Sequence, residues 1–170
     1  MALLPILCYP DPKLHTVAKP VTRFDEALKT TIANMFETMY EAKGIGLAAT
    51  QVDFHERLIV LDVSEEKNKP LVVINPTIMS SSSEHIVGEE GCLSVPGVYD
   101  EVERAQTVEI AYLDEHGQSQ RLVAHDLLSV CIQHEMDHLM GRVFVEYLSP
   151  LKRNRIKTKM IKAQREASRS

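Results

Sequence analysis

The sequence of 170 residues has no tryptophan, five tyrosines and four phenylalanines, so aliphatic side chains must fill most of the interior. Its three cysteines, Cys8, Cys92 and Cys131, are odd in number and widely spaced, which is not the pattern of a disulfide framework. The first residues lack the basic and apolar regions of an export signal, and no apolar run is long enough to span a membrane. We therefore expect a cytoplasmic protein.

The composition is that of one soluble globular domain, with 44% apolar and 25% charged residues. The net charge of −5 is unevenly distributed. From Lys152 onward there are eight basic residues and one acid, Glu166, a net charge of +7 that leaves −12 for the rest of the chain. This asymmetry favours a basic interaction tail on an acidic body. The alternative is an amphipathic helix that packs its apolar side on the rest of the protein and exposes its basic side to solvent.

Apolar spacing and turn residues predict a mixture of helices and strands. Asp25 is suited to cap a helix, Pro76 and the serines at 80–83 to end a strand in a loop, and residues 114–117 to form a hairpin turn. We expect helices at 11–15, 25–43, 126–140 and from 150 onward, and strands at 57–63, 71–75, 98–103, 107–113 and 120–124. A single α+β domain without internal repeats follows from this order.

One predicted helix carries the motif H-E-x-x-H. Its histidines, His134 and His138, lie one turn apart on one helix face, so both imidazoles can reach one metal ion. Glu135 lies about 100° further round the helix, beside the metal, where a carboxylate can accept a proton from water. Two surface histidines on a polar helix are the alternative, but Leu127 and Cys131 continue the histidine face as an apolar stripe.

A catalytic site of this kind needs a third protein ligand. Phe144 occupies the position where metzincins have their third histidine, and Glu146 could serve only if the chain turned back sharply. Cys92, in the segment EGCLSVP, is the better candidate because Gly91 and Pro96 place it in a loop or at a strand end. Taken alone, it would be interpreted as a small buried hydrophobic residue.

Three segments of the chain resemble the motifs of the bacterial peptide deformylases, in the same order. They are GIGLAATQV at 44–52, EGCLSVP at 90–96 and QHEMDHLMG at 133–141. The resemblance extends over most of the chain. It implies an α+β fold with mixed or antiparallel sheets around a central metal-binding helix and a C-terminal helix. Residues 1–150 would be the catalytic domain, and 151–170 a basic C-terminal helix of the same domain.

The resemblance also implies a reaction. The expected activity is hydrolytic removal of the N-formyl group from the initiator methionine of nascent proteins, with release of formate. A metal-bound hydroxide would attack, with Glu135 as the acid–base. Cys92, His134 and His138 would bind one Fe²⁺ per chain, with Ni²⁺, Co²⁺ or Zn²⁺ as possible substitutes. The Gln51 side chain and the Leu93 N–H would donate to the formyl oxygen, on which negative charge grows.

The methionine side chain requires an apolar pocket. The family's first motif, with Ile45 and Gly46, lines the substrate cleft, and Leu127, Val130 and Cys131 precede His134 on the helix. Ordinary core packing is the alternative for these residues. Family members that have an arginine beyond the cysteine motif differ from this chain, where Tyr99 follows Gly97 and Val98. Contacts with the rest of the peptide therefore remain open.

The expected partners are N-formyl-methionyl nascent peptides and, through the basic tail, the ribosome. No membrane and no DNA partner is expected. Two other functions compete with this interpretation. An H-E-x-x-H metalloprotease would cleave peptide bonds without releasing formate, and a non-catalytic ribosome-binding protein with a structural metal would tolerate loss of Glu135.

Overall fold

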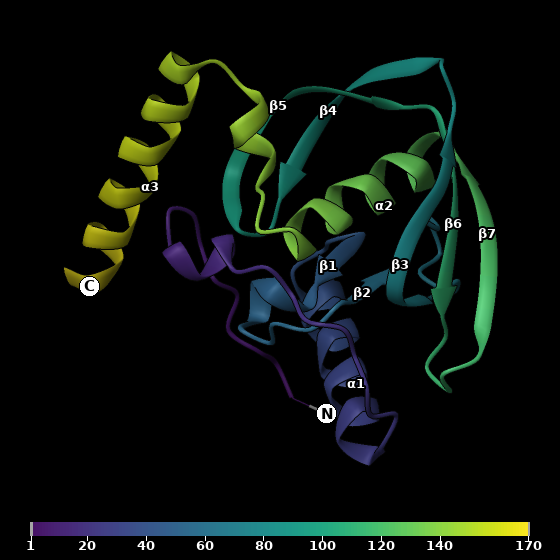
Figure 1. Ribbon diagram of the computed structural model, residues 1–170. Coiled ribbons are helices and arrows are strands. Elements are labelled where there is room, and N and C mark those ends of the chain that lie inside the picture. Colours follow the sequence, from purple (N-terminus) through teal and green to yellow (C-terminus); the bar gives the residue numbers. More distant parts are fainter. Residues whose placement is uncertain (1, 170) are drawn as a thin grey trace.

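The structure is a computed structural model that describes residues 2–169. A central helix, α2, lies between a five-stranded sheet and a two-stranded sheet (Figure 1). The helices are η1 (Pro12–His15), α1 (Glu26–Glu41), η2 (Ala49–Val52), α2 (Asp126–Leu139), η3 (Phe144–Tyr147) and α3 (Pro150–Arg169). The strands are β1 (Gly46–Ala48), β2 (Leu58–Leu61), β3 (Leu71–Ser81), β4 (His85–Cys92), β5 (Val95–Ala105), β6 (Thr107–Leu113) and β7 (Ser119–His125).

The larger sheet has the order β1-β2-β3-β6-β7, and β4 pairs with β5 in the smaller one. All of these strand pairs are antiparallel, which confirms the α+β prediction in its antiparallel form. The helices predicted around 25–43, 126–140 and from 150 are confirmed, as is the hairpin of β6 and β7. Asp25 caps α1 as expected, its side chain accepting a hydrogen bond from the Leu28 N–H.

One prediction in the strand region was wrong, and one strand was missed. β3 does not end at Pro76 but continues to Ser81, so Ser80 and Ser81 are not loop residues. Proline is tolerated because the pairing with β6 shifts register between Ile74 and Thr77, where the missing N–H interrupts no regular ladder. β4 was not predicted because its glycines and acidic residues have low strand propensity; it forms by pairing along its length with β5.

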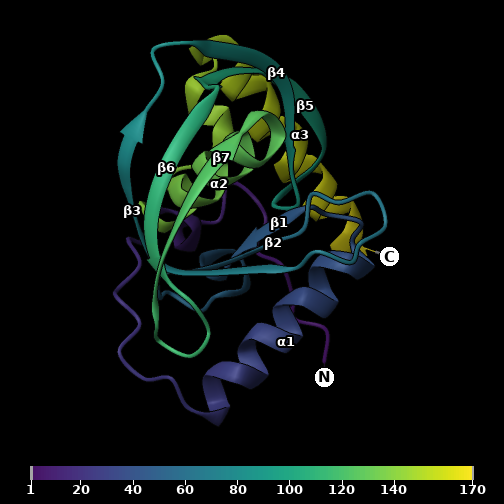
Figure 2. The same ribbon diagram turned by 90° about the vertical axis from the view of Figure 1, so that its right-hand side faces the viewer.

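The strand β2 shows how two helices share the larger sheet. All four of its side chains are fully buried. Alternate residues face opposite sides of a strand, so Ile59 and Leu61 pack in the cluster that includes α2, while Leu58 and Val60 pack in the cluster that includes α1. Figure 2 shows α1 beneath the sheet and α2 on its other side. The helix that carries the H-E-x-x-H motif is therefore a core element.

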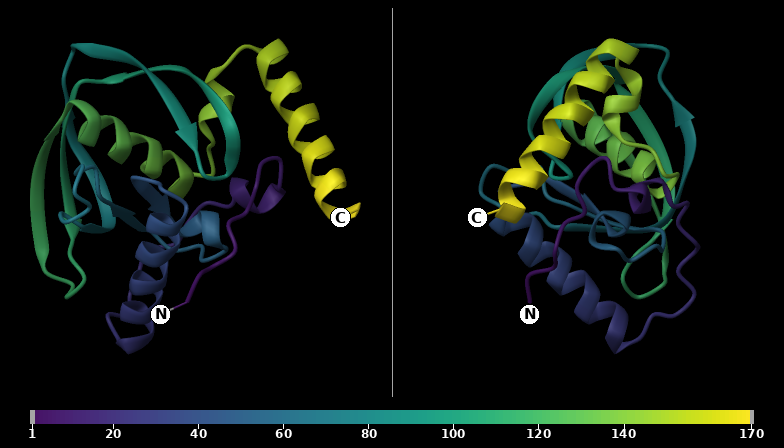
Figure 3. Two further views of the ribbon diagram at one scale, coloured as in Figure 1. Left: turned by 180° about the vertical axis from the view of Figure 1, so that it is seen from behind. Right: turned by 90° about the vertical axis from the view of Figure 1, so that its left-hand side faces the viewer.

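The end of α2 is fixed by Gly141. Its φ of +79° belongs to the left-handed region, and a Cβ at this position would lie 2.5 Å from the His15 carbonyl oxygen. The chain then turns through η3 into α3, which lies at the periphery of the molecule (Figure 3). Ile156 and Met160 are buried against a third cluster, whereas Ala163, one turn further along α3, is exposed. Within residues 2–169, no helix combines the length and apolar character needed to cross a membrane.

Candidate active site

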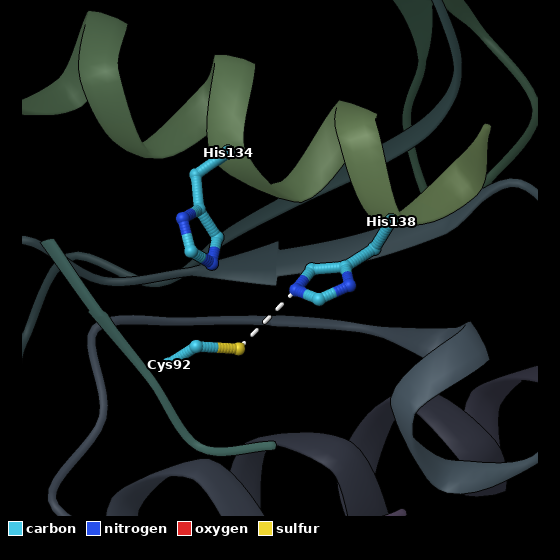
Figure 4. A group of neighbouring side chains, drawn as sticks. All are labelled: Cys92, His134 and His138. Atoms are coloured by element: carbon cyan, nitrogen blue, oxygen red, sulfur yellow. Dashed lines mark hydrogen bonds between the residues drawn. The ribbon is translucent and has the colours of Figure 1, made fainter. Parts of the chain in front are cut away.

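Two elements bring the predicted metal ligands together. His134 and His138 project from one face of α2 toward Cys92, the last residue of β4 (Figure 4). One ligand atom from each residue lies within 4.8 Å of the others, and Cys92 Sγ is 3.3 Å from His138 Nε2. Among the described residues, no other group of histidine, cysteine and acidic side chains meets this geometry.

The alternative ligand, Glu146, lies outside this group. Its carboxylate accepts a hydrogen bond from the Val143 N–H at 3.3 Å and pairs with His15 at 3.3 Å. The chain does turn after Gly141, but Glu146 then contacts Val143 and His15 and not the ligand group. Glu146 therefore has a structural role in the connection between α2 and α3.

The donor set fits a transition metal. One cysteine sulfur and two imidazole nitrogens suit divalent iron, nickel, cobalt or zinc and do not suit magnesium or calcium, which prefer oxygen. His138 is fully buried, and burial holds its pKa well below the usual value. Its imidazole is therefore neutral, which is the form that coordinates a metal.

Glu135 lies beside the ligands in a space that depends on a glycine. Its side chain is buried, with Oε1 at 3.9 Å from His138 Nε2 and without a hydrogen-bond partner among the described residues. A Cβ on Gly46 of β1 would lie 2.7 Å from Glu135 Oε2. Burial raises the pKa of Glu135 to about 7, within the range where a carboxylate can both accept and return a proton near neutral pH.

His134 is oriented by a carboxylate that the sequence analysis quoted but did not interpret. The His134 Nδ1–H donates to Glu90 Oε1 at 2.8 Å, which leaves Nε2 directed at the ligand group. Arg104 donates to both oxygens of Glu90, at 2.8 and 2.9 Å. Although burial opposes it, these hydrogen bonds lower the pKa of Glu90 to about 2.

Sequence alone offered a weak signal for Glu90. Residues two apart in a strand face the same side, so Glu90 shares the face of Cys92. Because β4 itself was not predicted, that alternation could not be used. Arg104 carried no signal beyond being a basic residue in an acidic segment.

Gln51 is held by both ends of its amide. Its Oε1 accepts the Ala48 N–H at 2.9 Å, while Nε2 donates to Ser94 Oγ at 3.0 Å and contacts Cys92 Sγ at 3.5 Å. The amide nitrogen is therefore turned toward the ligand group. Ser94, which completes this arrangement, was missed because a lone serine in a turn has no distinguishing pattern.

A cleft of about 730 Å³ opens over the ligands. Its wall contains every residue predicted to bind substrate or catalyse, and His138 lies buried outside it. The predicted residues in the wall are Ile45, Gly46, Gln51, Cys92, Leu93, Leu127, Val130, Cys131, His134 and Glu135. Burial raises the pKa of Cys131 to about 12, so this thiol is protonated and contributes an apolar surface. Tyr99, 65% exposed, lies at the rim.

A buried carboxyl group beside two helix-borne histidines and a cysteine, below an open apolar cleft, is the arrangement of a metal-dependent hydrolase, and this is the class of the chain. Residues 3–154 match the model of the polypeptide deformylase family. The chain therefore belongs to the polypeptide deformylase family.

Individual relatives agree over nearly the whole length. The chain is 64% identical to Peptide deformylase 1 of Burkholderia multivorans, over 97% of this chain and 91% of that protein. It is 59% identical to a peptide deformylase of Neisseria meningitidis, over 97% of this chain and 98% of the relative. A crystal structure of a peptide deformylase from Legionella pneumophila superposes with a TM-score of 0.93 at 46% identity, covering 99% of both chains.

Proposed function

We propose that this protein removes the N-formyl group from the initiator methionine of nascent proteins by hydrolysis and releases formate. The observation that carries the proposal is the Cys92, His134 and His138 group with Glu135 beside it, in a chain that belongs to the polypeptide deformylase family. Nascent chains are made in the cytoplasm, and the proposal places the protein there.

Cys92, His134 and His138 would hold one metal ion, ferrous in the cell, with nickel, cobalt or zinc as substitutes. When bound, such an ion lowers the pKa of a coordinated water from about 16 toward 7 and polarises a carbonyl oxygen. The arrangement of the two histidines on consecutive turns and of the cysteine on a separate strand supports this ligand set.

Glu135 is the proposed acid–base. Its Oε1, which accepts no hydrogen bond from the described residues, lies 3.9 Å from His138 Nε2, so it can accept a proton from the attacking water and pass it to the amine that leaves. One proton moves from water to the leaving nitrogen, and the C–N bond of the formamide is replaced by a C–O bond. The products are formate and a free N-terminus.

Gln51 and the Leu93 N–H are the proposed donors to the formyl oxygen. The Ala48 N–H fixes the Gln51 amide so that its nitrogen faces the cleft, and the Cys92 contact at 3.5 Å is long enough to yield to a better acceptor. Leu93 precedes Ser94, whose hydroxyl holds the same amide. Donors fixed before substrate arrives stabilise developing charge without reorganisation.

The methionine side chain would occupy the apolar part of the cleft. Ile45 approaches from the start of β1, and Leu127, Val130 and Cys131 from the first turns of α2. A flexible thioether fits such a surface well. Leu127 is 51% exposed and forms the outer edge, while Cys131 is buried and forms the inner wall.

The deciding experiment measures formate release from a short formyl-methionyl peptide by protein loaded with iron without oxygen, or with nickel. Glu135→Gln keeps the shape of the side chain and removes its proton transfer, and should lower turnover by about 10²- to 10⁴-fold. Glu103→Gln, on the exposed side of β5, is the matched control and should behave as wild type. Peptide cleavage without formate would indicate a protease, and full activity of Glu135→Gln would remove its assigned role.

The basic helix α3 would bind the ribosome. Lys159, Lys162 and Arg165 of this helix are exposed, and clustered positive charge gives salt-dependent affinity for RNA. Truncation after Lys152 would also remove the buried Ile156 and Met160, so charge neutralisation is the cleaner test. The variant is Lys159→Gln, Lys162→Gln and Arg165→Gln together.

This triple variant should bind ribosomes at least several-fold more weakly at low salt and deformylate short peptides normally. The control neutralises Lys29, Lys67 and Lys69, which changes net charge equally but lies away from α3. Equal ribosome binding by both triple variants would remove the tail from the interaction.

A further inference from the structure

We propose that Tyr147 is a positioning residue for the metal ligand His134, which it reaches through a series of three charged side chains, two of them buried. The series consists of Asp137, Arg104 and Glu90. Tyr147 belongs to η3, between the metal-binding helix and α3, and lies outside the cleft. The inference rests on the proposed function, because it concerns how one of the proposed ligands is held.

The contacts form an unbroken series. The Tyr147 hydroxyl donates to Asp137 Oδ2 at 2.7 Å, and Arg104 Nη1 donates to the same oxygen at 2.6 Å. Arg104 also donates to both oxygens of Glu90, which in turn accepts the His134 Nδ1–H. Charge-assisted hydrogen bonds of this length restrict the position of each group.

Arg104 depends on this series because it is buried. Its side chain is 5% exposed and Glu90 is 6% exposed, so their charges have lost nearly all contact with water. A buried charge is costly unless it is paired and fully hydrogen-bonded. Two carboxylates, Glu90 and Asp137, divide the donors of the Arg104 guanidinium between them.

Tyr147 covers the outer side of Arg104 in two ways. Its ring lies under the guanidinium, with Arg104 Cζ 5.0 Å from the ring centroid, a distance at which cation–π attraction operates. Its hydroxyl fixes the oxygen of Asp137 that Arg104 uses. Without the hydroxyl, Asp137 would be held by Arg104 alone and could turn more easily toward solvent, because its side chain is already 17% exposed.

The two histidine ligands differ in their dependence on such support. His138 Nδ1 has no hydrogen-bond partner among the described residues, and the imidazole is held by complete burial. His134 is held by the Glu90 hydrogen bond at the wall of the cleft. Disrupting this series of hydrogen bonds should therefore displace His134 and weaken metal retention. The hydrogen-bond partners of metal ligands tune the affinity for the metal.

The test measures metal retention directly. Nickel-loaded protein is mixed with excess chelator, and the rate of metal transfer is followed for wild type, Tyr147→Phe and Tyr147→Leu. Tyr147→Phe keeps the ring on Arg104 and loses only the hydroxyl. It should release metal about 10-fold faster, which is the smaller of the effects expected when a hydrogen-bond partner of a metal ligand is removed. Tyr147→Leu loses both contacts and should release metal faster still.

Tyr40→Phe is the matched control. The Tyr40 hydroxyl donates to buried Asp62 at 2.6 Å, so this variant also removes a short tyrosine–aspartate hydrogen bond, but Tyr40 does not line the cleft. Its metal release should equal that of wild type. Equal release by Tyr147→Phe and Tyr40→Phe would overturn the inference.

A second variant, Asp137→Asn, covers the possibility that Tyr147 variants fold poorly. It should release metal at least as fast as Tyr147→Phe and should alter the visible spectrum of the cobalt form, which reports ligand geometry. An unchanged spectrum with wild-type release would again overturn the inference. If wild type itself binds no metal, the proposed function fails and not merely the role of Tyr147.

Discussion

The carboxylate of Glu135 occupies a space that one glycine keeps open. A Cβ on Gly46 would lie 2.7 Å from Glu135 Oε2 and 3.2 Å from its Cδ, closer than side-chain atoms pack. The Glu135 carboxylate and a side chain at residue 46 would therefore compete for the same volume. The absence of a side chain at residue 46 therefore leaves room for the proposed acid–base.

Gly46→Ala should move the Glu135 carboxylate and lower kcat/KM for formyl-methionyl peptides by about 10²-fold, the cost of a displacement near 1 Å. Gly88→Ala is the matched control, because no atom lies within 4 Å of a Cβ added there. Steady-state kinetics and a melting curve for both variants separate misplacement from unfolding. Wild-type kcat/KM in Gly46→Ala would contradict the packing argument.

Asp62 joins two elements, β2 and α1. It follows β2 directly, is 1% exposed, and accepts a hydrogen bond from Tyr40 of α1 and two from Ser64. Burial opposes ionisation, but these hydrogen bonds outweigh it and hold the pKa of Asp62 below its usual value. The folded protein therefore stabilises the ionised form.

Because the pKa is lowered by folding, this contribution is present above the unfolded value of about 4 and is lost as pH falls through the folded pKa. Asp62→Asn should lower the free energy of unfolding at pH 7 by about 1.5–3 kcal/mol, the range for a hydrogen bond to a charged group. Urea unfolding of both proteins from pH 7 to pH 3 should show the difference shrinking with acid. A difference that stays constant with pH would refute the assignment.

At the scale of the whole molecule, a bound metal would join two parts of the fold. Cys92 comes from the two-stranded sheet, and the histidines come from the helix packed on the five-stranded sheet. A ligand that binds only the folded protein stabilises it by mass action.

Nickel at about 100 times its dissociation constant should therefore add about 2.7 kcal/mol, which raises the melting temperature by about 5–10 °C in a protein of this size. Cys92→Ser should lose most of this rise, and chelator should reverse it in wild type. A calorimetric scan with and without nickel makes the comparison. No metal-dependent shift in wild type would argue against a site shared between the two sheets.

The sequence by itself determined the local features of this protein. Asp25 and Gly141 set helix ends through capping and a positive φ, and the H-E-x-x-H spacing placed two histidines on one helix face, because these effects act within one or two turns. The motif segments were enough to indicate the family.

Tertiary structure decided what depends on distant segments meeting. β4 forms only because β5 pairs with it, and Pro76 stays within β3 because the sheet is irregular there. The links from Glu90 to Arg104 and from Asp137 to Tyr147 join a small sheet, a helix and a connection, and no residue spacing encodes them. Buried charges must find partners wherever the fold brings them, and that is a property of the packed chain.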